Sequence, residues 1–171
     1  MEKKGKLAGL LILGFLIGFL PTVWGIVATA AGVKTGTVAL IAAGIFAANG
    51  NKYEDAIKVI LGFWLGDLWS VLTVLMMGNI GINPIAANFI VFIPMAMIAV
   101  AIGAIGNKIF YLPSILVGWA IGLTFIGTPG AEIGTYPIQV AISELVGVLV
   151  VGIGVDLIQK FLVKPFVKKE A

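Results

Sequence analysis

Long apolar runs dominate this chain and restrict what it can fold into. Six runs follow one another with only short connections, at about 7–31, 35–48, 57–77, 85–105, 109–127 and 136–158. About 20 apolar residues are enough to cross the roughly 30 Å hydrocarbon core of a bilayer as an α-helix. The chain is 60% hydrophobic and 11% charged, whereas soluble domains carry roughly 25% charged residues. We therefore predict an all-α, polytopic transmembrane bundle in which residues 1–171 form a single integral membrane domain.

The run 35–48 is short enough to be a re-entrant segment, and the lysines favour a full span. If all six runs cross, ten lysines fall on one side of the membrane and Lys34 alone on the other. If the second run does not cross, the best split is eight against three. Because lysines gather on the cytoplasmic side, the sequence predicts six spans with both termini cytoplasmic.

Two carboxyl groups lie inside these runs without a positive partner. Asp67 falls near the middle of the run 57–77, and Glu144 lies about eight residues into the last run. A carboxylate at the bilayer centre costs about 2.5–3.5 kcal/mol on insertion scales, so such a residue is a functional candidate by default. We expect both groups to be neutral. They would suit a proton, a small cation or a neutral polar solute, because no span interior holds a lysine for an anion. The alternative is a protonated acid that hydrogen-bonds to a facing helix.

Three further residues complete the candidate pathway. Trp64 and Ser70 lie about one helical turn before and after Asp67, on the same face. Pro21 lies deep in the first run, where it could break the helix beside a cavity. Bulk packing of the aromatic side chain and a plain kink at the proline are the alternatives. Pro21 with Asp67, and Pro94 with Glu144, also suggest an inverted repeat of three spans each.

Glycines are spaced for close contact between helices. Among 23 glycines, the pairs Gly14 and Gly18, Gly62 and Gly66, and Gly118 and Gly122 each stand four residues apart. Small residues at this spacing let two membrane helices approach closely. They predict either packing within the chain or an interface in a homo-oligomer.

The composition removes most catalytic chemistry. The chain has no histidine, cysteine or arginine, so the common general base, thiol nucleophile, metal ligands and phosphate clamp are missing. We expect no enzymatic activity, no cofactor and no metal. The lysines cluster at the ends of apolar runs, so we expect no nucleic-acid partner. Asp156 stands four residues before Lys160 and is expected to pair with it near the membrane surface.

Two short stretches resemble the YcdZ-like family of small bacterial inner-membrane proteins, a domain of unknown function. The first is Trp24-Gly25-Ile26-Val27-Ala28 with Gly32 and Ala43-Gly44-Ile45-Phe46-Ala47; the second is Tyr111-Leu112-Pro113-Ser114 with Gly118 and Phe125-Ile126-Gly127. The resemblance implies a multi-pass, all-helical protein of the inner (plasma) membrane. It supplies no activity and no site residues.

We interpret the sequence as a channel or transporter for a small cation or neutral polar solute, surrounded by the lipid bilayer. The alternative is a non-transporting membrane subunit or scaffold that binds partner helices through its glycine grooves. A polar, water-sized path to Asp67 would favour transport, whereas a dry, packed surround would favour the scaffold.

Overall fold

The computed structural model describes residues 2–127 and 132–164, and its regular elements are all helices. In chain order they are α1 (Glu2–Ala30), α2 (Val38–Ala48), a short 3-10 helix η1 (Tyr53–Asp55), α3 (Ala56–Asn79), α4 (Pro84–Ile105), α5 (Leu112–Ile126), α6 (Tyr136–Val146), a π-helix η2 (Gly147–Ile153) and α7 (Gly154–Val163). The last three follow without a break and form one rod. The prediction of an all-α chain is confirmed, and each of the six apolar runs contains helix.

Helix length divides the six runs into two classes. Four helical stretches are long and apolar enough to cross a membrane, at Leu7–Ala30, Tyr53–Asn79, Ile85–Ile105 and Tyr136–Val163. Helix α2 has 11 residues and α5 has 15, which at 1.5 Å per residue gives about 17 Å and 23 Å. Both are shorter than the hydrocarbon core of a bilayer. The length criterion thus supports four of the six expected spans.

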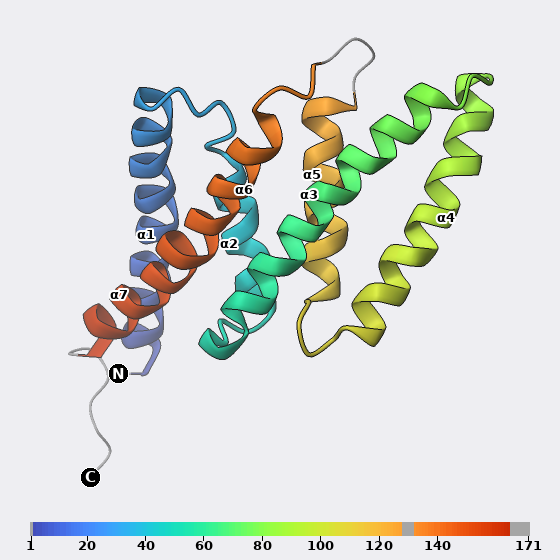
Figure 1. The fold of residues 1–171 in the computed structure, drawn as a ribbon. Coiled ribbons are helices and arrows are strands. Elements are labelled where there is room, and N and C mark those ends of the chain that lie inside the picture. Colours follow the sequence, from blue (N-terminus) through green and yellow to red (C-terminus); the bar gives the residue numbers. More distant parts are fainter. Residues whose placement is uncertain (1, 128–131, 165–171) are drawn as a thin grey trace.

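The helices run alternately between two ends of the molecule (Figure 1). Helix α1 begins and α7 ends at the same end, which we call the terminus end; the opposite end is the far end. Helices α1, α3 and α5 run from the terminus end to the far end, and α2, α4 and α6–α7 run back. The first three helices and the last three therefore run in opposite directions.

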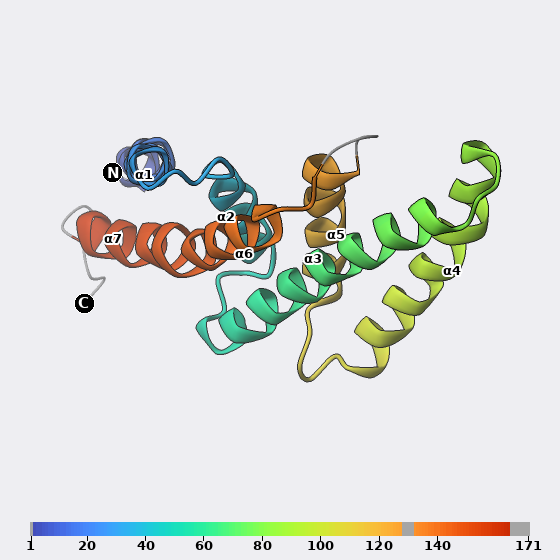
Figure 2. The same ribbon diagram turned by 45° about the horizontal axis from the view of Figure 1, so that its top comes forward.

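The two halves of the chain are interleaved. Helices α1 and α2 pack against the rod α6–η2–α7 of the second half, while α4 and α5 pack against α3 of the first half. Figures 1 and 2 show the two groups side by side, with α1 and α4 at opposite edges. Each half thus contributes its third helix to the other half. This arrangement supports the inverted repeat that the proline and acid positions suggest.

Small residues allow α3 and α5 to lie in backbone contact. A Cβ atom on Gly66 would overlap the backbone of Ile115 and Trp119, and one on Gly118 would overlap the backbone of Phe63. The glycine pairs predicted on these two runs therefore pack against each other within the chain.

Helix α2 and the rod α6–η2 make the corresponding contact in the other group. The hydroxyls of Thr35 and Ser143 are hydrogen-bonded at 3.1 Å. One turn further along, a Cβ on Gly147 would overlap the backbone of Ala39. Small side chains set the distance between helices here too.

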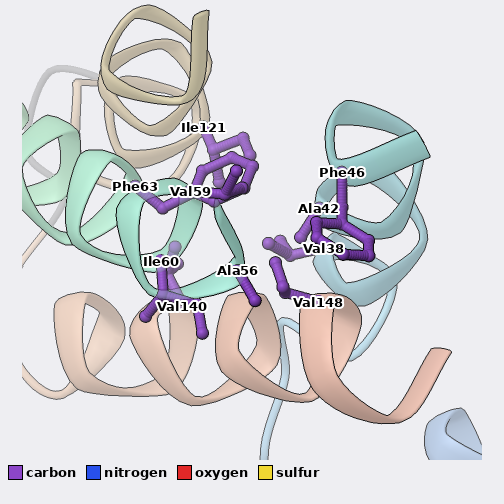
Figure 3. Close-up of a cluster of buried hydrophobic side chains, with 10 residues drawn as sticks. All are labelled: Val38, Ala42, Phe46, Ala56, Val59, Ile60, Phe63, Ile121, Val140 and Val148. Atoms are coloured by element: carbon purple, nitrogen blue, oxygen red, sulfur yellow. The ribbon is translucent and has the colours of Figure 1, made fainter. Parts of the chain in front are cut away.

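A hydrophobic cluster fills the space between the two groups (Figure 3). Phe46 and Val38 of α2, Val59 and Phe63 of α3, and Val148 of η2 belong to it, and each is almost completely buried. Several of these side chains come from the terminus-end half of α2 and α3. The region between the two acids and the terminus end is therefore tightly packed.

The irregular part of the helices lies after Glu144 and not at Pro21, where a break was expected. Helix α1 continues through Pro21, so the predicted helix break is wrong: the proline removes one backbone hydrogen bond without ending the helix. The irregular segment is instead η2, a π-helix that starts three residues after Glu144. π-Helical segments are rare and occur frequently at functional sites.

Candidate functional site

Asp67 and Glu144, the two acids singled out from the sequence, lie together in the fold. Asp67 lies midway along α3 and Glu144 on α6, two helices that pass each other in opposite directions. Their carboxyl groups are close enough to interact electrostatically, and the structure shows no hydrogen bond between them. Asp67 is 5% exposed and Glu144 is 0% exposed. The two acids therefore form a buried carboxyl pair between the two halves of the chain.

No described residue donates a hydrogen bond to the four carboxyl oxygens of this pair. Two carboxylates can only accept hydrogen bonds, so the contact is favourable when at least one of them carries a proton and donates it to the other. Two bare charges would repel each other in a medium of low dielectric constant. A proton on either carboxyl group would remove this repulsion.

A narrow cleft lies beside Asp67, between α3, α5 and α6. Ser70 and Gly122 line its inner part, and Phe125 and Tyr136 line the part toward the far end. Its gaps are too small for a water-sized sphere. The water-sized path to Asp67 that would favour transport is therefore not found in this cleft, among the described residues.

Of the other three candidate pathway residues, only Ser70 lies at the site of the carboxyl pair. Ser70 lies in the cleft, and its Oγ donates to the backbone carbonyl of Asp67 at 2.7 Å. Trp64 is 41% exposed and donates through Nε1 to the carbonyl of Ala141 at 3.2 Å. Pro21 lies on α1, which packs against α7 and η2 rather than α3. Asp67, Glu144 and Ser70 therefore share one site, and Trp64 and Pro21 lie outside it.

The sequence contains a signal for this site that is more specific than the proline spacing, namely a short pattern repeated around the two acids. When the two acids are aligned, Gly66-Asp67-Leu68-Trp69-Ser70-Val71-Leu72 matches Ser143-Glu144-Leu145-Val146-Gly147-Val148-Leu149. The shared pattern is small, acid, Leu, any, small, Val, Leu. In both copies the two small residues face a partner helix, α5 for the first and α2 for the second. The repeat therefore places each acid directly after a helix contact.

Larger hollows lie away from the pair. One of about 880 Å³ lies between α1 and the start of α2 and includes Gly18, Pro21 and Gly25, and one of about 230 Å³ lies between α1, α2 and the rod η2–α7. Within the described part of the chain, no group of three or more Asp or Glu residues could hold a metal ion. The carboxyl pair is therefore our candidate site, because its ionisable side chains are buried where the two halves of the chain contact each other.

Comparison with known families gives one match. Residues 15–160 match the family model described as "Protein of unknown function (DUF1097)". The chain belongs to this family. The match covers α2 to α6 and most of α1 and α7, so the carboxyl pair lies within the DUF1097 region. No curated protein and no solved structure matches the chain.

A second polar cluster of this DUF1097 protein lies at the terminus end. Lys160 Nζ is 2.7 Å from Asp156 Oδ2, which confirms the ion pair expected from the spacing. The hydroxyl of Tyr53 donates to the same carboxylate, and Lys160 lies over the Tyr53 ring. Tyr53 was missed in the sequence because it comes from a distant segment. Unlike Asp67 and Glu144, Asp156 has both a positive partner and a hydrogen-bond donor.

Proposed function

We propose that this protein is a carrier for a small cation or neutral polar solute, and that protonation of the Asp67–Glu144 pair drives its cycle. The observation that supports this most directly is the pair itself: four buried carboxyl oxygens have no donor among the described residues. The free energy of protonating such a pair depends on the charges and hydrogen-bond donors that lie beside it. A proton, a small cation or a neutral solute with hydrogen-bond donors is what such a site would bind and release.

Energetics favour a functional role for the pair over a structural one. Replacing a buried polar pair with packed apolar residues is often neutral or stabilising, so this pair is a weak way to hold helices together. Small residues already join α3 to α5, and α2 to α6, through close contact. Ionisable residues inside membranes mostly mark pathways for ions and protons.

The position of the pair supports a carrier. Many secondary transporters place their site near the midplane, between two inverted repeats that rock against each other. Here one acid comes from the third helix of each half, and the two halves run in opposite directions. The gaps beside Asp67 are too narrow for water, which suits an occluded carrier better than an open channel.

The charge distribution defines the class of solute. The lysines of the described residues lie outside the middle of the helices, and none of them acts on the carboxyl pair. An anion would meet two acids and no cation. A proton, a small monovalent cation or a neutral solute with hydrogen-bond donors would meet carboxyl oxygens and the Ser70 hydroxyl.

For the membrane topology, we propose six crossings with both termini in the cytoplasm of a bacterial inner membrane. The lysine distribution and the resemblance to YcdZ-like proteins support this topology. In the fold, α1 begins and α7 ends on the same side. The short helices α2 and α5 would cross together with the connecting residues that flank them.

A liposome flux assay tests the proposal. The purified protein is reconstituted, and uptake of protons, monovalent cations and a urea-like solute is followed under an imposed pH gradient. We expect flux through the wild type, with a loss of about tenfold or more in Asp67→Asn and in Glu144→Gln, since neither amide can carry the proton. Glu54→Gln, at an exposed carboxyl of η1, serves as the matched control. Wild-type flux equal to that of empty liposomes for every solute would contradict the proposal.

A second candidate function is a non-transporting membrane subunit, and two observations favour it. The cleft beside Asp67 is too narrow for water. Helix α1 is largely exposed, and a Cβ on Gly14, Gly18 or Gly25 would touch nothing within 4 Å. Under this alternative, the exposed face would receive a partner helix and the acid pair would be structural. The flux assay separates the two functions, because a scaffold gives no flux in any variant.

A further inference from the structure

The two sides of the carboxyl pair are packed differently, although the halves of the chain correspond. On the far-end side, Asp67 borders the cleft formed with Ser70, Gly122 and Val140. Toward the far end, Phe125 of α5 and Tyr136 of α6 face each other across this cleft. Their rings are stacked, with centroids 5.6 Å apart and an interplanar angle of 20°. The stack lies between the carboxyl pair and the far end of the molecule.

The corresponding positions on the terminus-end side are solidly filled. Aligning the halves on their acids places Val59 of α3 at the position of Tyr136 and Phe63 at that of Val140. Val59 and Phe63 are completely buried in the cluster of Figure 3, together with Ala42 of α2. A stacked pair over a narrow cleft on one side thus corresponds to a packed core on the other.

The two kinds of packing differ in how readily they open. The aromatic stack joins one residue near the end of α5 to the first residue of α6, and both rings are partly exposed. Opening it would separate the two stacked rings and part of the packing of Phe125 against the cluster of Figure 3. Opening the terminus-end side would separate several fully buried side chains on α2, α3 and η2, at a much larger loss of apolar contact.

We propose that the carboxyl pair is reached from the far end, and that the Phe125–Tyr136 stack is the gate of this approach. Ser70 is then the first polar side chain that an arriving solute meets. Its hydroxyl donates to the Asp67 backbone carbonyl, which leaves the oxygen lone pairs free to accept a hydrogen bond or to contact a cation. This inference rests on the carrier function proposed above and specifies from which side the site loads in this conformation.

The absence of cysteine from the chain makes site-directed labelling a direct test. Single cysteines are introduced at Ser70 and at Val140 in the cleft, and at Ala42 in the terminus-end core. Thr37→Cys and Lys52→Cys, at exposed positions near the far end and the terminus end, report which side a reagent reaches. A membrane-impermeant maleimide is applied to intact cells and to inside-out vesicles, and the labelling rate is measured with and without Tyr136→Ala.

We expect Ser70→Cys and Val140→Cys to react only from the side that labels Thr37→Cys. Tyr136→Ala should accelerate both by about tenfold, the order of effect that one stacked aromatic pair supplies. Ala42→Cys should stay unlabelled from both sides in both backgrounds. Gel filtration of each variant confirms that it is folded.

Three results would overturn the inference: labelling of the cleft cysteines from the side of Lys52→Cys, a labelling rate unchanged by Tyr136→Ala, or no labelling in either background. Labelling does not depend on transport. Absence of flux together with the expected labelling would therefore contradict the carrier function and leave the far-end approach standing. Flux with the opposite labelling would contradict the approach alone.

Discussion

Gly66 of α3 and Gly118 of α5 lie in direct backbone contact, with no room for a side chain on either. Asp67 follows Gly66 directly, so the same contact that joins the helices fixes where the carboxyl group lies. Ser143 and Glu144 repeat this relationship on α6, where Ser143 is hydrogen-bonded to Thr35, three residues before α2 begins. Helix packing and the position of the acids are thus linked in both halves of the chain.

Substituting Gly66 tests this link. In Gly66→Ala the new Cβ would overlap the backbone of Ile115 and Trp119, and overpacking of this kind typically costs about 1–3 kcal/mol. We expect a clearly lower thermal midpoint in detergent, measured by circular dichroism or by gel filtration after heating. Gly14→Ala is the matched control, because its Cβ meets nothing within 4 Å. Equal midpoints for the two variants would contradict the close contact.

Neutral substitutions at the acid pair should leave the fold intact. The amide of Asp67→Asn can donate a hydrogen bond to Glu144 without a shared proton, and a hydrogen bond contributes roughly 0.5–1.5 kcal/mol. We expect a thermal midpoint equal to or above that of the wild type. Asp67→Ala instead leaves Glu144 without a partner in a buried place, and its midpoint should fall.

Comparing the double variant with the two single ones measures the contact between the acids directly. Residues in contact show coupling energies of about 0.5–3 kcal/mol, whereas distant residues are nearly additive. Strict additivity of Asp67→Ala and Glu144→Ala in the free energy of unfolding would show that the two side chains do not interact.

Thr73 supports a buried tryptophan. Its hydroxyl donates to the carbonyl of Trp69 at 2.7 Å and accepts from Nε1 of Trp119 at 3.0 Å. Thr73→Val keeps the shape but leaves the indole N–H without its acceptor, a loss of roughly 1–3 kcal/mol. Thr73→Ser keeps the hydroxyl and should lie much closer to the wild type. The thermal midpoints of the two variants, with tryptophan fluorescence as a local probe, check this expectation.

The cluster at the terminus end should be much less sensitive. Lys160 is well exposed beside Asp156, and exposed ion pairs contribute little to stability. Asp156 also accepts a hydrogen bond from Tyr53, so Lys160→Ala leaves the carboxylate with a partner. We expect a thermal midpoint close to that of the wild type. A large decrease would show that the ion pair anchors α7.

The sequence was sufficient for features that depend on short-range spacing. Apolar length predicts the helices, and the interval of four residues predicts both the Asp156–Lys160 pair and the glycine contacts of α3 and α5. The midspan position of Asp67 and the lack of a nearby lysine identify it as unusual. These signals work because they depend on a single helix or on the membrane itself.

The features that the sequence did not predict depend on contacts between segments that are far apart in the chain. Hydropathy does not distinguish α5, which has 15 residues, from a full span, because the flanking residues are apolar too. The direction in which Trp64 points is set by where α6 lies. The π-helix η2 contains glycines but no proline, and glycine is frequent throughout this chain. The meeting of Asp67 with Glu144 requires the interleaving of the two halves, which only the aligned acid motifs indicate.

The shortness of α2 and α5 has an electrical consequence. Under the topology proposed above, the membrane potential would fall mainly across the low-dielectric layer, and the short helices α2 and α5 would make that layer thinner beside the carboxyl pair than at the edges formed by α1 and α4. One elementary charge that crosses the full potential gains or loses about 2.3 kcal/mol per 100 mV. A proton that reaches the pair from the far end would cross part of this drop within a few turns of helix. Voltage would then act on the occupancy of the site as directly as the proton concentration does.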